Sequence, residues 1–348
     1  MSRNISRQLL AWYDIHRRDL PWRAGPGMTA DPYRVWLSEI MLQQTTVATV
    51  KTYYGNFLAK WPEIEKLAAA ELDEVLHAWQ GLGYYSRARN LHKCAREIVA
   101  AHDGRFPADE QCLRKLPGIG PYTAAAIAAI AFGLKATPVD GNIERVTARL
   151  HAINDPLPGA KKDIKSFAEA MTPDHRAGDF AQALMDLGAT VCKPKHADCP
   201  NCPLGAACRA GAGDNPERFP VKAPKKARPT RYGIVFWAER DDGAVLLRRR
   251  AEEGLLGGMA EFPSTDWMET PWAEKPPDGF APIEADWLPM PGTIVHIFTH
   301  FRLELGVVRA RVEGALGSNL DWCHPDSFGA RALPTVMKKV ARHVLDTP

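Results

Sequence analysis

Four cysteines lie within one short stretch of the chain, with the spacing C-x6-C-x2-C-x5-C: Cys192, Cys199, Cys202 and Cys208. Thiolates are soft metal ligands, and this loop is short enough to wrap one metal centre. Structural zinc sites usually present two C-x2-4-C pairs far apart in sequence, whereas one such pair is present here, at 199–202. The spacing therefore favours one [4Fe–4S] cluster, with zinc as the alternative.

A second candidate feature is a glycine turn at 116–124, where Gly118 and Gly120 precede a predicted helix. Glycines there allow backbone amides and the helix N-terminus to approach a phosphate closely. Further along, the run Val-Asp-Gly-Asn at 139–142 places Asp140 and Asn142 where either could cap the next helix. By itself the turn is weak evidence for a nucleic-acid contact.

The elements that would position these residues change in type along the chain. Apolar spacing predicts an all-α front, with helices at Val35–Val47, Glu63–Ala69, Leu72–Gln80, Ser86–Ala101 and Pro121–Phe132 and another after Asn142. Alternation in the back predicts an α+β domain, with a hairpin of Tyr232–Ala238 and Ala244–Arg248 across Asp241–Gly243, and strands at Thr293–His296 and Phe301–Arg311.

Charge changes at the same place. Residues 1–231 carry 32 Lys or Arg against 24 Asp or Glu, and residues 232–348 carry 12 against 17, so the net charges are +8 and −5. A basic front attracts polyanions, although a solvated surface is the simpler explanation of such asymmetry. The Pro- and Lys-rich residues 215–230 suit a linker, and Pro271–Pro282 suits a surface loop.

Composition excludes two classes of protein. The sequence contains no apolar stretch long enough to cross a membrane or to serve as a signal peptide. Seven cysteines, an odd number, argue against a disulfide framework. We therefore expect a cytoplasmic monomer without membrane contact, associated with the nucleoid if the chain is bacterial.

The glycine turn, the 139–142 run and the cysteine loop recur together in base-excision glycosylases resembling endonuclease III, which carry a helix–hairpin–helix motif. Within that superfamily the chain most resembles the MutY family of adenine DNA glycosylases over residues from about 7 to 312. The runs that carry this resemblance are LPWR at 20–23, VWLSEIMLQQT at 35–45, GLGYYSR at 81–87 and MDLGA at 185–189.

The resemblance implies a multidomain chain that binds double-stranded DNA across a cleft between two helical domains. A six-helix barrel domain with the helix–hairpin–helix would span 30–133, and an iron–sulfur cluster domain would comprise 1–29 and 134–214. The linker 215–230 would lead to a Nudix-like domain at 231–348. Gly118 and Gly120 would contact the DNA backbone.

Two carboxylates suit the chemistry of this family, because adenine leaves poorly without a proton and the sugar develops positive charge. By resemblance Glu39 is the general acid, and its apolar helical surroundings would favour the protonated form. Asp140 would stabilise the sugar cation or attack it transiently, supported by Asn142. Without the family, Glu39 would be an ordinary helix glutamate and Asp140 a helix cap.

Tyr122 stands where bifunctional relatives have a lysine that forms a Schiff base with the sugar. The resemblance therefore implies an enzyme without efficient lyase activity, in which Tyr122 positions the sugar or stabilises charge.

Other positions match residues that contact the DNA in this family. Arg23 and Gln182 would contact the extruded adenine, although generic surface hydrogen bonding is the simpler explanation for both. Flipping a base leaves a hole in the stack, and the matching residues that would fill it or lie beside it are Gln44, Thr45, Leu82 and Tyr84. Core packing is a plausible alternative for Leu82.

The segment Arg250–Pro263 resembles the glycine turn that opens a Nudix fold. The Nudix catalytic helix needs a run R-E-x-x-E-E to bind magnesium, and no such run follows Pro263. In the MutY family this domain reads 8-oxoguanine through a Phe-Ser-His loop, which is present here as Phe298, Thr299 and His300. Threonine keeps the hydroxyl group and adds a methyl group.

Together these features predict a monofunctional glycosylase that excises adenine opposite 8-oxoguanine or guanine. The alternatives are a glycosylase with lyase activity or another target base, a nucleotide-pool hydrolase, and a non-catalytic DNA-binding protein with a cluster. The absent Nudix helix disfavours the hydrolase, and the binding protein would require Glu39 and Asp140 to be incidental.

Overall fold

The structure, a computed structural model, describes residues 2–213, 215–224, 227–251, 254–272, 279–313 and 320–347. The chain separates into two compact units. The first unit comprises residues 1–83 and 87–224, and the second comprises residues 84–86 and 225–348. Within the described ranges, no helix has both the length and the apolar character needed to cross a bilayer. Parts of the predicted linker and of the predicted loop at Pro271–Pro282, together with Glu252 and Glu253, lie outside the described residues.

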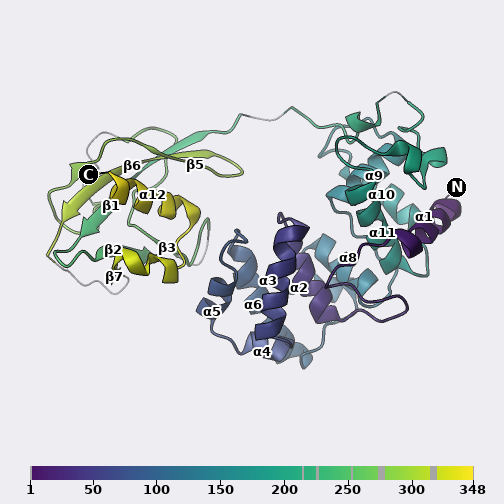
Figure 1. Cartoon of the computed structure of the whole chain (residues 1–348), viewed down its shortest axis with the longest axis horizontal. Helices are drawn as coiled ribbons and strands as arrows, with labels where there is room; N and C mark the ends of the chain where they lie inside the picture. The colour runs from purple at the N-terminus through teal and green to yellow at the C-terminus, as the bar shows by residue number, and fades with distance from the viewer. Residues whose placement is uncertain are drawn as a thin grey trace. The chain divides into compact units, whose positions relative to one another are not determined.

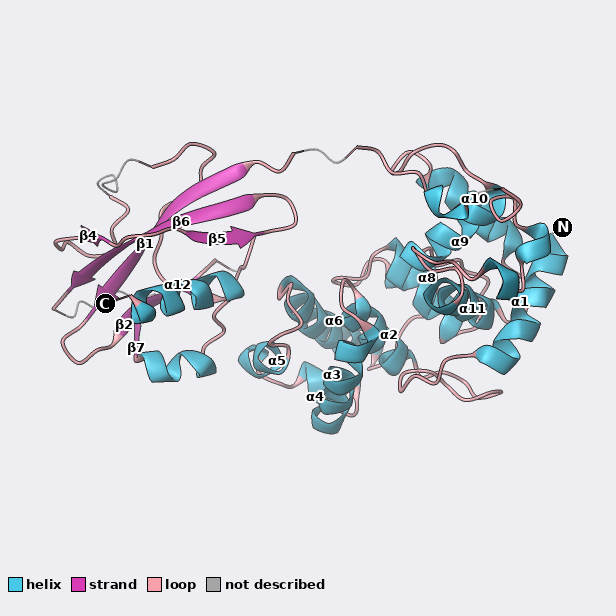
Figure 2. Cartoon of the chain, turned by 45° about the horizontal axis from the view of Figure 1, so that its top comes forward, coloured by secondary structure: helices cyan, strands magenta, loops and turns pink. Residues whose placement is uncertain are grey.

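The first unit is helical throughout, and the strands belong to the second unit (Figures 1 and 2). Three short 3-10 turns, η1 to η3, follow the α-helices: Cys199–Asn201, Gly205–Ala207 and Pro216–Arg218. The α-helices of this unit are α1 Ser2–His16, α2 Pro32–Leu42, α3 Val47–Lys60, α4 Ile64–Ala68, α5 Leu72–Ala78, α6 Ser86–His102, α7 Glu110–Leu113, α8 Pro121–Ile130, α9 Gly141–His151, α10 Lys161–Met171 and α11 Ala177–Thr190.

The predicted helix Val35–Val47 is wrong at its C-terminal end, because α2 stops at Leu42. Gln44 then has a left-handed backbone with φ of 56°, which no α-helix can continue through. The hydroxyl of Thr46 accepts a hydrogen bond from the backbone N–H of Thr49 and caps a new helix, α3. The apolar spacing continues through this break, so the sequence pattern alone hid both the break and α3.

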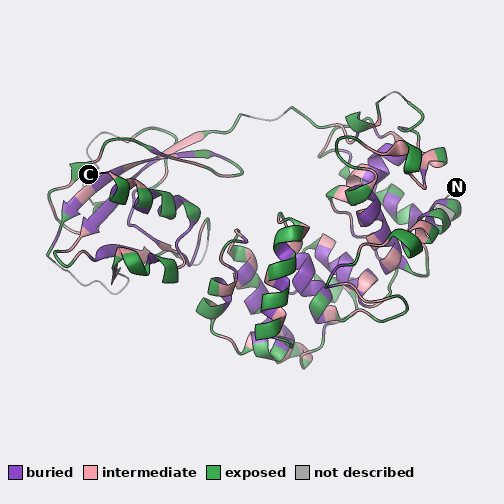
Figure 3. Ribbon diagram, in the orientation of Figure 1, coloured by how far each residue is buried: buried purple, intermediate pink, exposed green. Residues whose placement is uncertain are grey.

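Helix α11 packs closely against α8 and α9 at two glycines. A Cβ atom at Gly178 would lie 2.4 Å from the carbonyl oxygen of Ala129, and one at Gly188 would lie 2.6 Å from Cβ of Asn142. Most residues of α11 between Ala177 and Gly188 are buried, and buried residues of the helices are coloured purple in Figure 3. Close packing of backbone on backbone thus joins the helices that carry the candidate site.

The second unit is built on a mixed seven-stranded sheet with the order β3-β2-β1-β6-β4, in which β5 also pairs with β6 and β7 with β2. Helix α12, Thr335–Asp346, lies over one face of the sheet and packs its apolar side chains against it (Figure 1). A 3-10 turn, η4, spans Pro325–Ala330. The strands are β1 Thr230–Glu239, β2 Val245–Arg249, β3 Ala260–Glu261, β4 Leu288–Pro289, β5 Ile294–Ile297, β6 Arg302–Arg311 and β7 Leu320–Cys323.

The predicted hairpin is confirmed, since β1 and β2 pair antiparallel with Glu239 opposite Val245. Strands β1 and β6 pair in parallel over ten residues, from Thr230 opposite Arg302 to Glu239 opposite Arg311. Local patterning carries no information about this pairing of distant segments. The fold class is nonetheless as predicted, with a helical region followed by an α+β domain.

Two glycine substitutions test the close packing of α11. Replacing Gly178 by Ala forces a methyl group against backbone atoms of α8, so the free energy of unfolding should fall by about 1–3 kcal/mol. The control is Gly55→Ala in α3, where nothing lies within 4 Å of the added Cβ. That change should raise the free energy of unfolding by roughly 0.5–1 kcal/mol, because alanine favours a helix over glycine. Urea denaturation measures both, and equal effects of the two substitutions would contradict the packing argument.

Candidate active site

Glu39 is buried on α2, with 7% of its surface exposed. The hydroxyl of Tyr122, near the start of α8, donates a hydrogen bond of 2.8 Å to Oε2 of Glu39. Burial raises the pKa of Glu39 to about 7, against the opposing effect of the Tyr122 hydrogen bond. Glu39 is therefore a carboxyl group that can hold a proton near neutral pH.

Asp140 is the N-cap of α9, as the simplest interpretation of its sequence suggested. Its carboxylate accepts hydrogen bonds from the backbone N–H groups of Asn142 and Ile143, at 2.9 and 2.7 Å, and from the side-chain amide of Asn142 at 2.8 Å. The charge of Asp140 also contributes to the raised pKa of Glu39. The helix cap therefore lies close enough to the buried carboxyl group to interact with it electrostatically.

Asn142 is itself held in place. The Arg145 guanidinium donates to its Oδ1 at 2.9 Å and to the carbonyl of Gly188 at 2.7 Å. Because Cβ of Asn142 lies against Gly188, a larger residue on α11 at that position would displace it. The orientation of Asp140 thus depends on the packing of α9 against α11.

A cavity of about 50 Å³ lies beside Glu39 and contains both residues predicted to contact adenine, Arg23 and Gln182. Its wall is mainly apolar and includes Trp22, Leu42 and Met185. The amide of Gln182 donates weakly to the carbonyl of Gly178, at 3.4 Å. Tyr122 and Asp140 do not line this cavity, so Glu39 is the carboxyl group that faces it.

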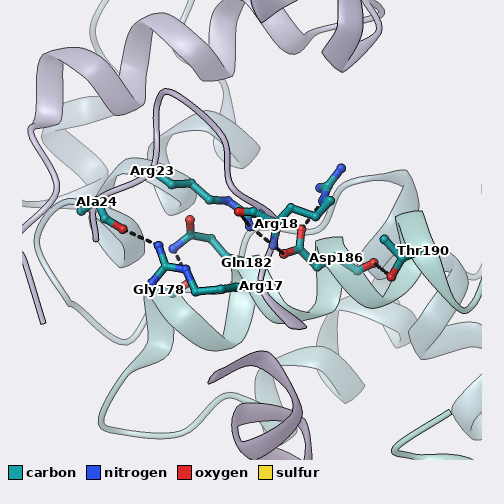
Figure 4. A network of polar contacts seen from close by, with 8 residues as sticks. All are labelled: Arg17, Arg18, Arg23, Ala24, Gly178, Gln182, Asp186 and Thr190. Carbon is teal, nitrogen blue, oxygen red and sulfur yellow. Dashed lines mark hydrogen bonds and ion pairs between the residues drawn. The ribbon is translucent and has the colours of Figure 1, made fainter. Parts of the chain in front are cut away.

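A buried ion network fixes Arg23 (Figure 4). Asp186 on α11 is fully buried and accepts two hydrogen bonds from the Arg23 guanidinium, at 2.6 and 2.8 Å, and one from Arg18 Nε at 2.5 Å. Burial alone would raise the pKa of Asp186, but Arg23 and then Arg18 hold it below its usual value. No role was predicted for Arg18 or for Asp186, although Asp186 lies in the 185–189 run that carries the family resemblance and is an acidic residue inside an apolar helix.

Gln44 and Tyr84 are exposed, and both have left-handed backbones although neither is glycine, with φ of 56° and 47°. Such conformations are strained and are often found at functional sites. Leu82 is buried, which fits the packing role left open by the sequence. Thr45 is partly buried and accepts a hydrogen bond of 3.3 Å from the Arg87 guanidinium.

Arg87 ends the 81–87 run that carries the family resemblance, but no role was predicted for it. Its guanidinium donates to the carbonyl oxygens of Gln43 at 2.6 Å and of Leu82 at 2.8 Å, and it also reaches those of Ile40 and Met41. One side chain therefore joins the end of α2 to the 82–84 turn. The signal for this role was an arginine next to a glycine-rich turn.

The glycine turn has the geometry that its sequence predicted. Gly118 has φ of 75°, and a Cβ there would come within 2.8 Å of Asn90 Cβ, so other residues fit poorly. Gly120 is the N-cap of α8 and has open space around its Cβ position. Uncrowded amides at this helix N-terminus can approach an anion.

The four predicted cysteine ligands line one cavity of about 160 Å³. Burial, followed by the neighbouring cysteines, raises the pKa of Cys202 to about 11. Within the described ranges, no three His, Cys, Asp or Glu side chains are arranged to hold a single metal ion. The four thiols lie around one cavity and could together hold a metal centre.

Arg149 lies fully buried beside this cavity, and the sequence interpretation missed it. Its guanidinium donates to Sγ of Cys192 at 3.3 Å and to the carbonyl of Lys193 at 2.8 Å. The backbone N–H of Gly211 donates to Sγ of Cys208, also at 3.3 Å. A positive charge and N–H donors aimed at sulfur are features that stabilise anionic thiolate clusters.

In the second unit, the predicted reading loop joins β5 to β6. The backbone N–H of Phe298 donates to the carbonyl of Phe301 at 2.9 Å and closes the turn. Thr299 and His300 are exposed at its tip, whereas Phe298 is partly buried against Trp267 and Phe301. The loop therefore exposes two polar side chains, flanked by the aromatic side chains of Phe298 and Phe301.

Comparison with known proteins adds independent information. Residues 37–173 match the model of the HhH-GPD superfamily base excision DNA repair protein, and residues 234–343 match that of the NUDIX domain. Adenine DNA glycosylase of Homo sapiens is 36% identical over 397 residues, covering 96% of this chain and 72% of the relative. That of Mycolicibacterium smegmatis is 44% identical over 198 residues, covering 57% and 66%.

Solved structures agree with the helical part. A thermostable thymine-DNA glycosylase is similar with a TM-score of 0.54 and 30% identity, covering 61% of this chain and 96% of that one. Endonuclease III in a non-covalent DNA complex, at 24% identity and a TM-score of 0.51, shares the fold over 60% of this chain and 94% of its own. Because a human adenine DNA glycosylase matches 96% of this chain and residues 37–173 match a base excision DNA repair family, the chain belongs to the adenine DNA glycosylase family and is a DNA N-glycosylase of base excision repair.

Proposed function

We propose that this protein binds duplex DNA and excises adenine mispaired with 8-oxoguanine or guanine, without efficient strand cleavage. The observation that carries this proposal is the Glu39–Tyr122 pair. A buried carboxyl group with a pKa of about 7 faces a cavity. The side chain that donates a hydrogen bond to this carboxyl group is a tyrosine and not a lysine. The names of the relatives support adenine as the base.

In the proposed mechanism, the extruded adenine occupies the cavity lined by Arg23 and Gln182. Protonated Glu39 delivers its proton to N7 of the base, which then departs without carrying a negative charge. The Asp140 carboxylate stabilises the positive charge that develops on the sugar, held in position by its three N–H donors. Glu39, now ionised, accepts a proton from the attacking water.

Tyr122 orients Glu39 and provides no amine for a Schiff base, so the sugar remains attached to an intact strand. On the DNA, Gln44 and Tyr84 would fill the space left by the flipped base, with Thr45 beside them. Gly118 and Gly120 would bring backbone amides to a phosphate. Thr299 and His300 would read the base opposite adenine.

Cys192, Cys199, Cys202 and Cys208 would hold one [4Fe–4S] cluster, and Arg149 would offset part of its negative charge. When bound, the cluster supplies a rigid cross-link of the 192–208 loop. Lys193, Lys195 and Arg209 lie within or next to this loop and could then face DNA phosphates.

An excision assay tests the proposed function directly. Duplexes carry adenine opposite 8-oxoguanine, guanine or thymine, and strand breaks are measured with and without alkali. We expect breaks in the first two duplexes after alkali treatment, because an abasic site cleaves in alkali while Tyr122 forms no Schiff base. Breaks of equal yield without alkali would contradict monofunctional action, and intact strands in all three duplexes would favour a non-catalytic DNA-binding protein.

The role of Glu39 predicts a pH dependence with a definite sign. The general acid loses its proton as pH rises through about 7, so the excision rate should fall there. Glu39→Gln should retain duplex binding and lower the single-turnover rate by roughly 10²–10⁴-fold. Tyr122→Phe removes a hydrogen bond that lowers the pKa of Glu39, so the falling limb should move to higher pH. The control is Tyr33→Phe, whose hydroxyl bonds the carbonyl of Trp61; an equal shift there would refute the assignment.

Asp186 should matter for both stability and base binding. Asp186→Asn leaves Arg23 and Arg18 without their buried counter-charge, which should lower the free energy of unfolding by about 3–5 kcal/mol. Where the variant remains folded, its affinity for a duplex that contains a mispaired adenine should also fall. Asp179→Asn on the same helix breaks an exposed pair with Arg176 and should cost less than about 1 kcal/mol. Similar losses of stability in the two variants would disprove the role of Asp186.

A further inference from the structure

A large cavity in the second unit lies outside the proposed excision chemistry. It has a volume of about 740 Å³ and is lined by residues from the start of β1, the end of β2 and the segment that follows β3. Four of its lining side chains are arginines: Arg231, Arg248, Arg249 and Arg250. Among the described residues, the acidic side chains of this lining are Glu261 and Asp266.

The acidic residue Glu261 neutralises only part of this charge. Its buried carboxylate accepts a hydrogen bond from Arg248 Nε at 2.8 Å and another from Arg250 Nη1. The shared carboxylate holds the two guanidinium groups together in a fixed orientation. Such paired, pre-oriented guanidinium groups match the geometry of phosphate oxygens.

Arg231 completes the cavity from β1. Its guanidinium lies over the ring of Phe301, 4.7 Å from the centroid. In the structure, its Nε is buried and has no hydrogen-bond acceptor among the described residues. A buried donor without an acceptor costs free energy, so the described residues leave part of the hydrogen-bonding capacity of Arg231 unused beside the cavity.

We propose that this cavity binds the phosphate groups of a nucleotide. The arginine side chains supply the charge and the hydrogen-bond donors, and Trp267, which lies 5.3 Å from the Arg250 guanidinium, supplies an aromatic wall. The site binds without hydrolysis, because the sequence lacks the acidic run that would hold magnesium. A free nucleoside diphosphate or triphosphate and the backbone of DNA carry this same chemistry.

A ligand in the cavity could affect the β5–β6 loop through ring contacts of Trp267. The ring of Trp267 lies 5.8 Å from that of Phe298 and 6.3 Å from that of Phe301, both at the ends of the β5–β6 turn. A phosphate that fixes Arg250 over Trp267 would therefore order the aromatic side chains Phe298 and Phe301, which flank Thr299 and His300. Fluorescence of the tryptophans is a suitable reporter.

Calorimetric titration of the full chain with pyrophosphate, and then with dGTP, tests the proposal. We expect binding to the unmodified chain, weakened roughly tenfold or more in Arg231→Gln and in Arg249→Gln, because each change removes a charged donor. Arg249 is exposed, so its variant keeps the test valid if Arg231→Gln fails to fold. The control is Arg302→Gln on β6, outside the cavity, which should bind as the unmodified chain does. Absence of binding by both ligands, or equal affinity in all the variants, would overturn the proposal.

A second measurement distinguishes the sources of the phosphate. The affinity for a fully paired duplex is measured over a range of salt concentrations for the unmodified chain and for Arg249→Gln. If the cavity takes the DNA backbone, the slope of log affinity against log salt should decrease by about one. If the slope is unchanged while dGTP binding is weakened, the ligand is a free nucleotide. Neither measurement depends on excision, so its outcome is independent of the proposed glycosylase mechanism.

Discussion

The burial of one carboxyl group, Glu39, is the constraint on which the arrangement of the site depends. A carboxyl group removed from water resists ionisation, and the surrounding helices determine how strongly. Burial raises the pKa of Glu39, and the charge of Asp140 raises it further. The Tyr122 hydrogen bond lowers it. The pKa of Glu39 near neutrality therefore depends on helix packing, because Glu39 lies on α2, Tyr122 on α8 and Asp140 at the N-cap of α9.

Sequence patterns predicted the elements whose signals are local. Helical spacing located α5 and α6, and alternation with a Gly-containing turn located the β1–β2 hairpin. Residue type limited the cap of α9 to Asp140 or Asn142, and the structure shows that it is Asp140. The break after Leu42 was missed because apolar spacing continues across it, and the parallel pairing of β1 with β6 was missed because those strands are far apart in sequence.

The candidate site divides in the same way. Glu39 and the cysteines stand in recognisable runs, so the resemblance identified them, and the structure places Glu39 beside Tyr122 and the four thiols around one cavity. The supporting residues Asp186 and Arg149 were not predicted. Their roles depend on partners more than 40 residues away, and a buried charge in the sequence does not show which distant residue will pair with it. Both are buried charged groups, which the fold accommodates only because their partners are present.

The arginine that joins the end of α2 to the 82–84 turn has a consequence for how DNA is bound. The Arg87 guanidinium donates to the carbonyl groups of Gln43 and Leu82, which lie just before the two strained, exposed residues Gln44 and Tyr84. Their conformational entropy is therefore lost when the protein folds and need not be lost again on association. In the proposed role of Gln44 and Tyr84 at the flipped base, an enzyme that examines many undamaged base pairs would gain from such rigidity, since these side chains would need no further ordering at each encounter with DNA.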